Sequence, residues 1–525
     1  MKLNNKPMTP KIFLTAALAA LFSAGGFAQE TEVVTVTETV TEEIQPAEPK
    51  PDSVYTWMGQ AAVTWSSSHT PLWLTSNRYG LSSVSSNNGY VRAGFFKKMT
   101  HEKRFSWGAG VDLVAPWNFS SNFIIQQLYA QIRYRSLELT VGSKERTLDI
   151  VDNELSSGDL TFSANARPIP QVFISMPNYE FVPGTKRWLA AKGFFGIGMF
   201  TDWRWQEHHV VKNGKWQEHV LYASKGLMLR VGDPERHPLT FEGGLEMGTT
   251  MGGTVHYYNT TDKKMDVIKM PHDFKNICKA IIGLSGGDSD DPKQWGERAN
   301  AYGTTVGQWS AALTLKPAAW NGWSIRQYFE HYFEDHSMMF FDYMWKDMLL
   351  GTVIEFPKNP FVDKFLYEYL GMKDQAGPIF NDTNDKFPEQ VSGSDGYYNH
   401  SIYPGGWGHW GMGMGNPLLV SPIYNKNRSL TFKHNRVKAH HFGISGTPCD
   451  LFHYRVLMTY NRSWGTYDEP TNHVMHDFSW LIDATFSPQK WDGWKIGLSI
   501  AGDTGSLMGK STGAMLTLTK TGWIH

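Results

Sequence analysis

Residues 127–141, QLYAQIRYRSLELTV, decide the fold of this 525-residue chain. Leu128, Ala130, Ile132 and Tyr134 alternate with Gln127, Tyr129, Gln131 and Arg133; after Arg135 and Ser136, Leu137, Leu139 and Val141 alternate with Glu138 and Thr140. Side chains on a strand point alternately to opposite faces. The stretch therefore predicts a β-hairpin with one apolar and one polar face.

The same alternation recurs along the chain. Residues 105–113 place aromatic and aliphatic side chains opposite Ser, Gly and Asp, and residues 239–247 place Glu242 and Glu246 on the face opposite Leu and Phe. These carboxylates are expected to point toward a wet interior and away from lipid. Residues 495–500 and 515–521 predict the closing hairpin.

The N-terminal region predicts export. Lys2, Lys6 and Lys11 precede an apolar run over 12–27, and Gly26 and Ala28 occupy small-residue cleavage positions, so residues 1–28 are interpreted as a cleaved signal peptide. Residues 29–54 are rich in Thr, Val, Glu and Pro and are interpreted as a disordered periplasmic leader. Residues 55–525 remain for the folded part.

Composition restricts the fold of that part. The sequence after the signal holds no apolar run of the roughly 20 residues that a membrane-spanning helix needs, while the chain has 50 glycines and 14% aromatic residues. A membrane protein of this kind has to be a closed β-barrel. We predict an all-β outer-membrane barrel of roughly 16–18 antiparallel strands, with outer-membrane lipid and the outer-membrane insertion machinery as partners and a monomer favoured.

A soluble all-β protein is the alternative, since its strands alternate in the same way. Aromatic residues placed near expected strand ends favour the membrane barrel; these are Trp73, Tyr79, Trp107, Trp117, Trp188, Trp203 and Trp205.

Charge and cysteine content exclude other classes. The 49 basic and 50 acidic residues nearly balance, which argues against nucleic acid as a partner. Cys278 and Cys449 are the only cysteines, so neither a disulfide framework nor a thiolate metal site is indicated, and a single bridge between them stays open.

Two segments carry a resemblance to a known family. They are residues 143–170, which include ELSSGD and NARPIP, and residues 396–419, GYYNHSIYPGGWGHWGMGMGNPLL, followed by Asn435-Arg436-Val437. Residues 326–341 add a weaker likeness. The chain resembles the Wzi family of outer-membrane capsule-assembly proteins. The resemblance implies a barrel of about eighteen strands in the outer membrane of a Gram-negative bacterium that binds capsular polysaccharide without catalysis.

Candidate binding residues lie in these segments, because aromatic rings, amides and guanidinium groups suit sugar rings and hydroxyls. They are Tyr397, Tyr398, Asn399, His400, Tyr403, Trp407, His409, Trp410, Asn165 and Arg167. The alternative for 397–410 is an interfacial girdle or packing inside the barrel, and for 153–170 a loop that is simply folded inward.

The lumen arginines Arg92, Arg133 and Arg230 are expected to pair with lumen carboxylates such as Glu242 or Glu246.

Enzyme interpretations find little support, and we predict a protein that is not an enzyme and needs no cofactor or metal. The histidine groups Glu207-His208-His209 and His331–His336 lack the spacing of a zinc hydrolase. His336-Ser337 as a hydrolase pair is a dipeptide without an orienting third group. Besides capsule binding, the porin stays open as a second function and a barrel hydrolase as a third.

Overall fold

The computed structural model describes residues 55–524 except 101–103, 148–149, 283–302, 335–338, 340–345, 376–378, 382–390 and 393. The signal peptide and the leader expected over 1–54 lie outside the described residues, as does the His336-Ser337 pair.

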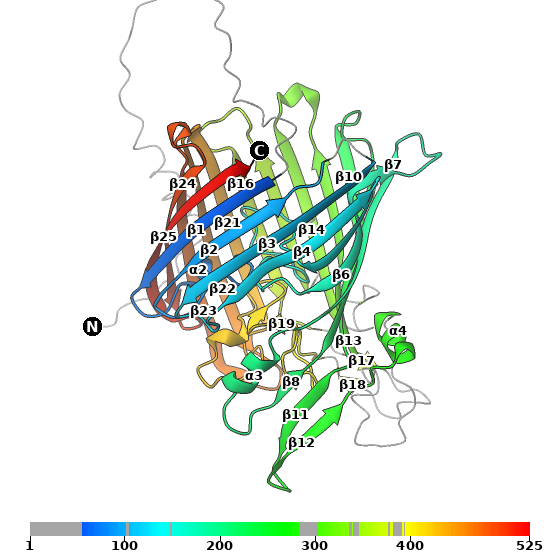
Figure 1. Cartoon of the computed structure of the whole chain (residues 1–525), viewed down its shortest axis with the longest axis vertical. Coiled ribbons are helices and arrows are strands. Elements are labelled where there is room, and N and C mark those ends of the chain that lie inside the picture. The colour runs from blue at the N-terminus through cyan, green and yellow to red at the C-terminus, as the bar shows by residue number, and fades with distance from the viewer. Residues whose placement is uncertain are drawn as a thin grey trace, which may run out of the picture. The chain divides into compact units, whose positions relative to one another are not determined.

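Eighteen antiparallel strands form one closed sheet in which each strand pairs with its neighbours along the chain and β25 pairs with β1 (Figure 1). This confirms the predicted all-β barrel and its strand number. The barrel strands are β1(Tyr55–Ser66), β2(Asn87–Lys97), β3(Phe105–Trp117), β4(Ile124–Tyr134), β5(Leu137–Ser143), β6(Gln171–Phe181), β7(Leu189–Met199), β9(Leu221–Val231), β10(Leu239–Met251), β13(Gly303–Leu315), β14(Ser324–Glu334), β15(Met348–Glu355), β16(Lys364–Met372), β21(Val437–Cys449), β22(Phe452–Gly465), β23(Pro470–Phe486), β24(Trp494–Gly505) and β25(Lys510–Ile524).

The hairpin of β4 and β5 is paired as its sequence predicts, with Ile132 opposite Leu139 and Tyr134 opposite Leu137. Arg135 has a φ of 57°. The left-handed conformation at this position suits a two-residue hairpin turn, whose twist matches that of the strands. A local turn and a local alternation therefore fix this register.

The two faces of the sheet are inverted relative to a soluble protein. Leu128 and Val91 are 53% and 62% exposed on the outer face, whereas the lumen residues Asp112 and Gln308 are fully buried. The apolar exterior suits contact with lipid, and the polar interior suits a hydrated lumen. This arrangement contradicts the alternative of a soluble all-β protein.

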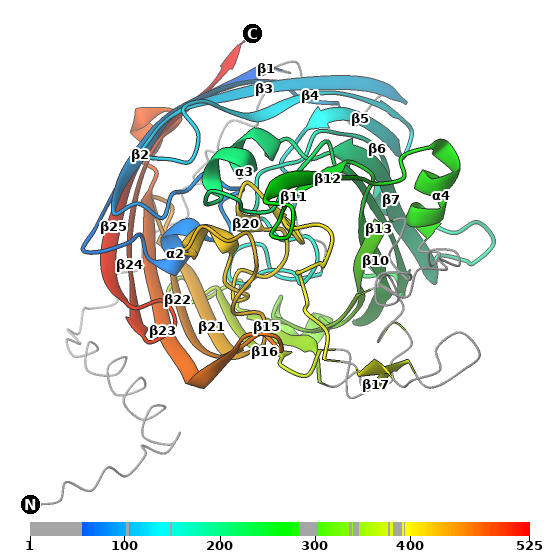
Figure 2. The same ribbon diagram turned by 90° about the horizontal axis from the view of Figure 1, so that it is seen from below.

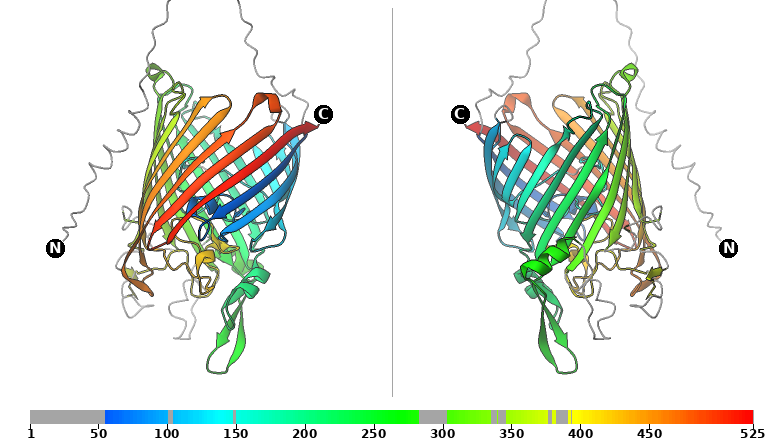
Figure 3. Two further views of the ribbon diagram at one scale, coloured as in Figure 1. Left: turned by 90° about the vertical axis from the view of Figure 1, so that its left-hand side faces the viewer. Right: turned by 90° about the vertical axis from the view of Figure 1, so that its right-hand side faces the viewer.

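The two ends of the barrel differ in the length of their connections. At the end that holds Tyr55 and Ile524, the turns are short, as at 135–136 and 450–451; the opposite end carries the long connections 144–170, 200–220, 252–302 and 373–436. We call these the short-turn end and the long-loop end. In both views of Figure 3 the hairpin of β11(Thr254–Asn259) and β12(Lys264–Lys269) projects beyond the long-loop end.

The remaining elements are short and belong to the connections. They are α2(Leu72–Thr75), α3(Trp203–His209), α4(Phe274–Ile282), β8(Trp216–Glu218), β17(Ile379–Asn381), β18(Val391–Ser392), β19(Gly408–His409), β20(Met412–Gly413) and the 3₁₀ turns η3(Ala318–Trp320), η4(Pro422–Tyr424) and η5(Gln489–Trp491). Among the described residues, no helix is long and apolar enough to cross a membrane. Cys278 and Cys449 are both free thiols, so no bridge joins them.

Not all of the aromatics expected at strand ends lie there. Trp117 ends β3 and is 55% exposed, but Trp73 is buried in α2, where its Nε1 donates to Thr459 of β22. Trp203 and Trp205 lie on α3, and Tyr79 donates from its hydroxyl to the Arg146 carbonyl. Proximity to a strand end in sequence does not distinguish a girdle residue from one on a loop that folds back into the barrel.

A charge on the outer face tests the inverted pattern. Leu128→Arg, near the middle of β4, is expected to lower the free energy of unfolding in lipid vesicles by about 2–4 kcal/mol. Tyr134→Arg, on the same face at the end of β4, is the control and should cost at most about 1 kcal/mol. Equal losses at the two positions would contradict a lipid-facing surface.

Candidate functional site

Two segments of the long-loop end fold back into the barrel and contact each other there; Figure 2 shows them crossing the lumen. We call residues 150–170 and 394–436 the plug. The Trp407 indole donates to the Thr161 carbonyl (2.8 Å), and Asn416 Nδ2 donates to Ser157 Oγ (3.1 Å). The two segments that carry the family resemblance are therefore one packed unit in space.

Carboxylates on the barrel wall hold the plug. Glu368 of β16 accepts hydrogen bonds from the Ser157 amide (2.8 Å) and the Ser156 hydroxyl (2.5 Å). Glu330 and Glu334 of β14 accept from the amides of Leu160 (3.0 Å) and Tyr398 (2.6 Å). A buried amide left without an acceptor is costly, so these contacts fix the plug backbone against the wall.

Inside the plug, Asp159 organises the turn that follows it. Its carboxylate accepts from the amides of Thr161 (2.7 Å) and Phe162 (2.6 Å) and from the Gln308 side chain (2.7 Å). Burial raises the pKa of Asp159, and the amide of Phe162 opposes that shift. Its hydrogen-bonding capacity is used by the protein itself.

Most of the candidate binding residues are interior to the plug. Tyr397, Tyr398, Tyr403, Trp407, His409 and Asn165 are at most 2% exposed. Their polar atoms have partners in the protein. Asn165 Nδ2 donates to the Gly413 carbonyl (3.0 Å) and the Tyr403 hydroxyl to the Gly252 carbonyl (3.1 Å). The structure thus realises the alternative in which these residues pack inside the barrel, and ligand contact by them stays a prediction.

Asn399 and His400 are half-buried and serve the plug backbone. Asn399 exchanges two hydrogen bonds with the Phe432 backbone (2.8 and 3.0 Å). His400 Nδ1 accepts from the Ile402 and Tyr403 amides, and burial lowers the pKa of His400 to about 4. The imidazole is therefore neutral at physiological pH.

Arg167 and Trp410 differ from the other eight because they line a pocket at the long-loop end, which we call the mouth pocket. Its volume is about 570 Å³, and loops 80–85, 119–120, α3 and the plug surround it. Its main side chains are Phe119, Arg167, Trp205, His209, Trp410 and Arg428.

The mouth pocket is built around Trp410. The Arg167 guanidinium lies 4.4 Å from the Trp410 ring centre, and Trp205 lies 6.3 Å from it at 41°. Trp410 has a φ of 55°, and its amide donates to Asp202 (2.9 Å). A left-handed backbone conformation is strained at a bulky residue. The position of the Trp410 ring is therefore set by its packing contacts and not by the local backbone preference.

The polar groups of the mouth pocket include both charged and neutral donors. Arg167 Nη1 donates to Ser121 (2.9 Å), and burial lowers the pKa of Arg167 to about 10, which leaves it charged at neutral pH. His209 stacks on Trp205 (4.5 Å), and its Nε2 is buried without a hydrogen-bond partner. The pKa of His209 is lowered mainly by burial and further by the positive charge of Arg428.

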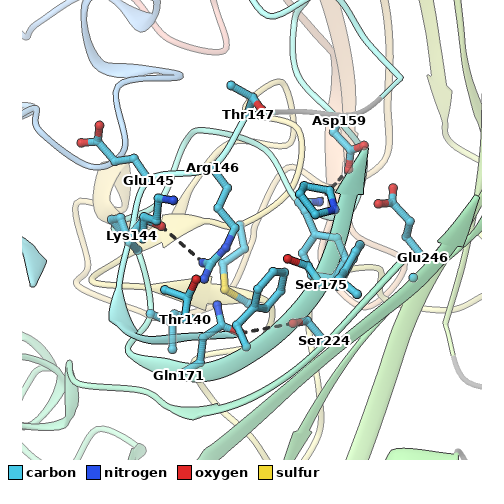
Figure 4. A pocket seen from close by; sticks show the side chains of 18 of the residues that line it. Thr140, Lys144, Glu145, Arg146, Thr147, Asp159, Gln171, Ser175, Ser224 and Glu246 are labelled. Atoms are coloured by element: carbon cyan, nitrogen blue, oxygen red, sulfur yellow. Dashed lines mark hydrogen bonds between the residues drawn. The ribbon is translucent and has the colours of Figure 1, made fainter. Parts of the chain in front are cut away.

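A second pocket of about 510 Å³ lies inside the barrel, bounded by the plug on one side and by β5, β6, β7, β9 and β10 on the other (Figure 4). We call it the lumen pocket. Along the wall it reaches Glu138, the second residue of β5 after the short turn 135–136. Arg167 lines both pockets, so the plug is thin at this residue.

The lumen arginines pair differently from the sequence expectation. Arg92 binds Asp112 (2.9 Å) and Glu145 (3.0 Å), while Glu242 binds Arg326 (2.7 Å). Arg230 lies 4.4 Å from the Tyr179 ring, and Arg133 donates to the Thr100 carbonyl. Arg92 pairs with lumen carboxylates as expected, and the acids that it binds are Asp112 on the neighbouring strand β3 and Glu145 on an inward connection.

Several residues of the mouth pocket were not predicted from the sequence to contact a ligand. Trp205 was assigned to a girdle, His208 and His209 to a polar loop, and Phe119 and Arg428 were not singled out. The signal available was the density of aromatic and imidazole groups in 203–209, WRWQEHH, which is the helix α3.

The histidine groups form no metal cluster within the described part of the chain. His331 is fully buried in β14, and its Nδ1 lies 3.0 Å from the Asp347 carbonyl.

Fold and pockets together define a class: an 18-stranded barrel of the outer-membrane type with an inward plug and a polar, aromatic mouth. No known protein family matches the sequence, and no curated protein matches it.

Solved structures match this fold over most of the chain. Wzi of Escherichia coli, an outer-membrane protein involved in group 1 capsule assembly and described as a carbohydrate-binding β-barrel, is 12% identical, with a TM-score of 0.50, over 88% of this chain and 83% of that one. OccAB4 of Acinetobacter baumannii is 9% identical, with a TM-score of 0.43, over 91% of this chain and 100% of its own. OprD of Pseudomonas aeruginosa is 8% identical, with a TM-score of 0.37, over 90% and 96%. At these identities, the similarity shows the fold alone.

Proposed function

We propose that this chain is a non-enzymatic outer-membrane barrel that binds capsular polysaccharide at its mouth pocket and supports attachment of the polymer to the cell. In such barrels short turns face the periplasm and long loops face outward. That orientation puts the mouth pocket at the cell surface.

The observation that carries the proposal is the Trp410 platform. An indole flanked by a guanidinium and a second indole provides a flat apolar surface next to planar donors, which is what a hydroxylated ring requires. A volume of about 570 Å³ suits a short stretch of a polymer. The E. coli neighbour Wzi, a carbohydrate-binding β-barrel, supports this proposal.

The direct test is binding of capsular polysaccharide, purified from the source bacterium, to the purified barrel in detergent. Saturable binding is expected. Absence of binding to the native polymer would contradict the proposal.

A porin is the second candidate, favoured by the polar lumen pocket. The wall carboxylates hold a buried plug across the lumen, so we expect little steady current when the barrel is inserted into a planar bilayer. The measurement is single-channel conductance at fixed voltage. A large, continuous conductance would instead support a porin.

A further inference from the structure

One guanidinium side chain in the lumen pocket has no acidic partner among the described residues. Arg146 enters this pocket from the connection after β5, and no carboxylate of the described residues forms an ion pair with Arg146. Its Nη2 is buried without a hydrogen-bond partner, and Nη1 makes one long contact to the Lys144 carbonyl (3.3 Å). Figure 4 shows its side chain pointing into the pocket toward Thr140 and Gln171.

The acidic residues that line the same pocket have other contacts. Glu145 accepts from Arg92 (3.0 Å) and Gln126 (2.7 Å), and Asp159 is held by amides of the plug. Glu246 accepts a hydrogen bond from Gln308 Nε2 (3.2 Å). Glu138 has a Coulombic interaction with the Lys144 ammonium group. Of the two guanidinium groups that line this pocket, Arg167 interacts electrostatically with Asp202, whereas Arg146 has no acidic partner among the described residues.

Burial makes this arrangement costly. Desolvation lowers the pKa of Arg146 to about 10, so the group stays charged at neutral pH although the side chain is half-buried and its Nη2 is fully buried. Its guanidinium lies 4.0 Å from the Phe173 ring, which offers only a partial replacement for hydration. An oxyanion that accepts two parallel hydrogen bonds would offset more of the cost.

The other residues that line the lumen pocket indicate what kind of molecule bears the oxyanion. Thr140, Ser175, Ser224 and Gln171 present hydroxyls and an amide, and Phe173 and Phe194 stack on each other at 5.4 Å. Hydroxyl and amide groups beside aromatic faces suit a hydroxylated ring more than an apolar acid. The volume of about 510 Å³ accommodates one or two such rings.

We propose that the lumen pocket binds a carboxylate-bearing sugar, with the carboxylate on Arg146 and the ring hydroxyls on the wall residues. The site lies on the opposite side of the plug from the mouth pocket and does not depend on polymer binding there.

The test is a saturation-transfer NMR titration of the purified full-length barrel with glucuronate, using glucose and inorganic phosphate as comparison probes. We expect glucuronate to bind and the two comparison probes to bind at least about tenfold more weakly. Arg146→Gln should weaken glucuronate at least about tenfold, since it removes a charged hydrogen bond. Arg146→Lys should retain part of the affinity because it keeps the charge without the planar fork.

Two controls separate this site from the mouth. Arg428→Gln, in the mouth pocket, should leave glucuronate binding unchanged, and Arg146→Gln should leave capsular polysaccharide binding unchanged. The proposal is overturned if glucuronate does not bind, if phosphate competes with it equally, or if Arg146→Gln abolishes binding of both ligands, which would indicate a structural role.

Discussion

Replacing Trp410 with alanine is expected to weaken binding of the native capsular polysaccharide about 30-fold. Removal of a central tryptophan from a desolvated site costs about 2 kcal/mol, which corresponds to that factor. The loss includes the surface against which Arg167 lies at 4.4 Å. The measurement is calorimetric titration of the polysaccharide into the purified barrel.

A tryptophan at the other end is the matched control. Trp188 is 52% exposed next to β7 at the short-turn end, and Trp188→Ala should leave the affinity unchanged. Equal effects of the two substitutions, or no effect of Trp410→Ala, would count against the mouth pocket as the binding site.

Glu368→Leu is expected to release part of the plug. The substitution removes the acceptor for the Ser157 amide and the Ser156 hydroxyl, and also for the Tyr328 hydroxyl. Unsatisfied buried donors cost about 1–3 kcal/mol each, so we expect a loss of stability of about 3–5 kcal/mol and a rise in single-channel current through the barrel.

Glu355→Leu serves as the control for Glu368→Leu. Glu355 lies at the short-turn end of β15, where it accepts from Ser324 (2.7 Å), and no hydrogen bond or ion pair joins it to the described residues of the plug. Its replacement should leave the current low. If Glu368→Leu also left current and stability unchanged, the wall carboxylates would not be what holds the plug.

The barrel was predictable because its determinants are local. The alternation in residues 127–141 and the turn at 135–136 specify a hairpin, and the apolar face of that hairpin is the exposed one. The length of the folded part, at about 10 residues per tilted strand plus turns and loops, implied roughly 16–18 strands. The closing pair of β1 with β25 follows once the other strands are in place.

The plug was less accessible to sequence reasoning because its position depends on distant residues. The Tyr398 amide donates to Glu334, and His409 Nδ1 lies 3.0 Å from the Arg167 carbonyl oxygen. Nothing in the run 397–410 reveals that its aromatic rings turn inward. That Arg146 forms no ion pair with any described residue is likewise a property of the fold, since Glu145 is its sequence neighbour but binds Arg92.

Capsule retention in the native bacterium tests the central claim most directly. The gene would be deleted and restored as the wild type or as Trp410→Ala, and capsular polysaccharide would be quantified on the cells and in the medium. We expect polymer to be made but shed in the deletion strain, retained with the wild type and largely shed with Trp410→Ala. Unchanged cell-bound capsule in the deletion strain, with no related protein present to compensate, would contradict the claim.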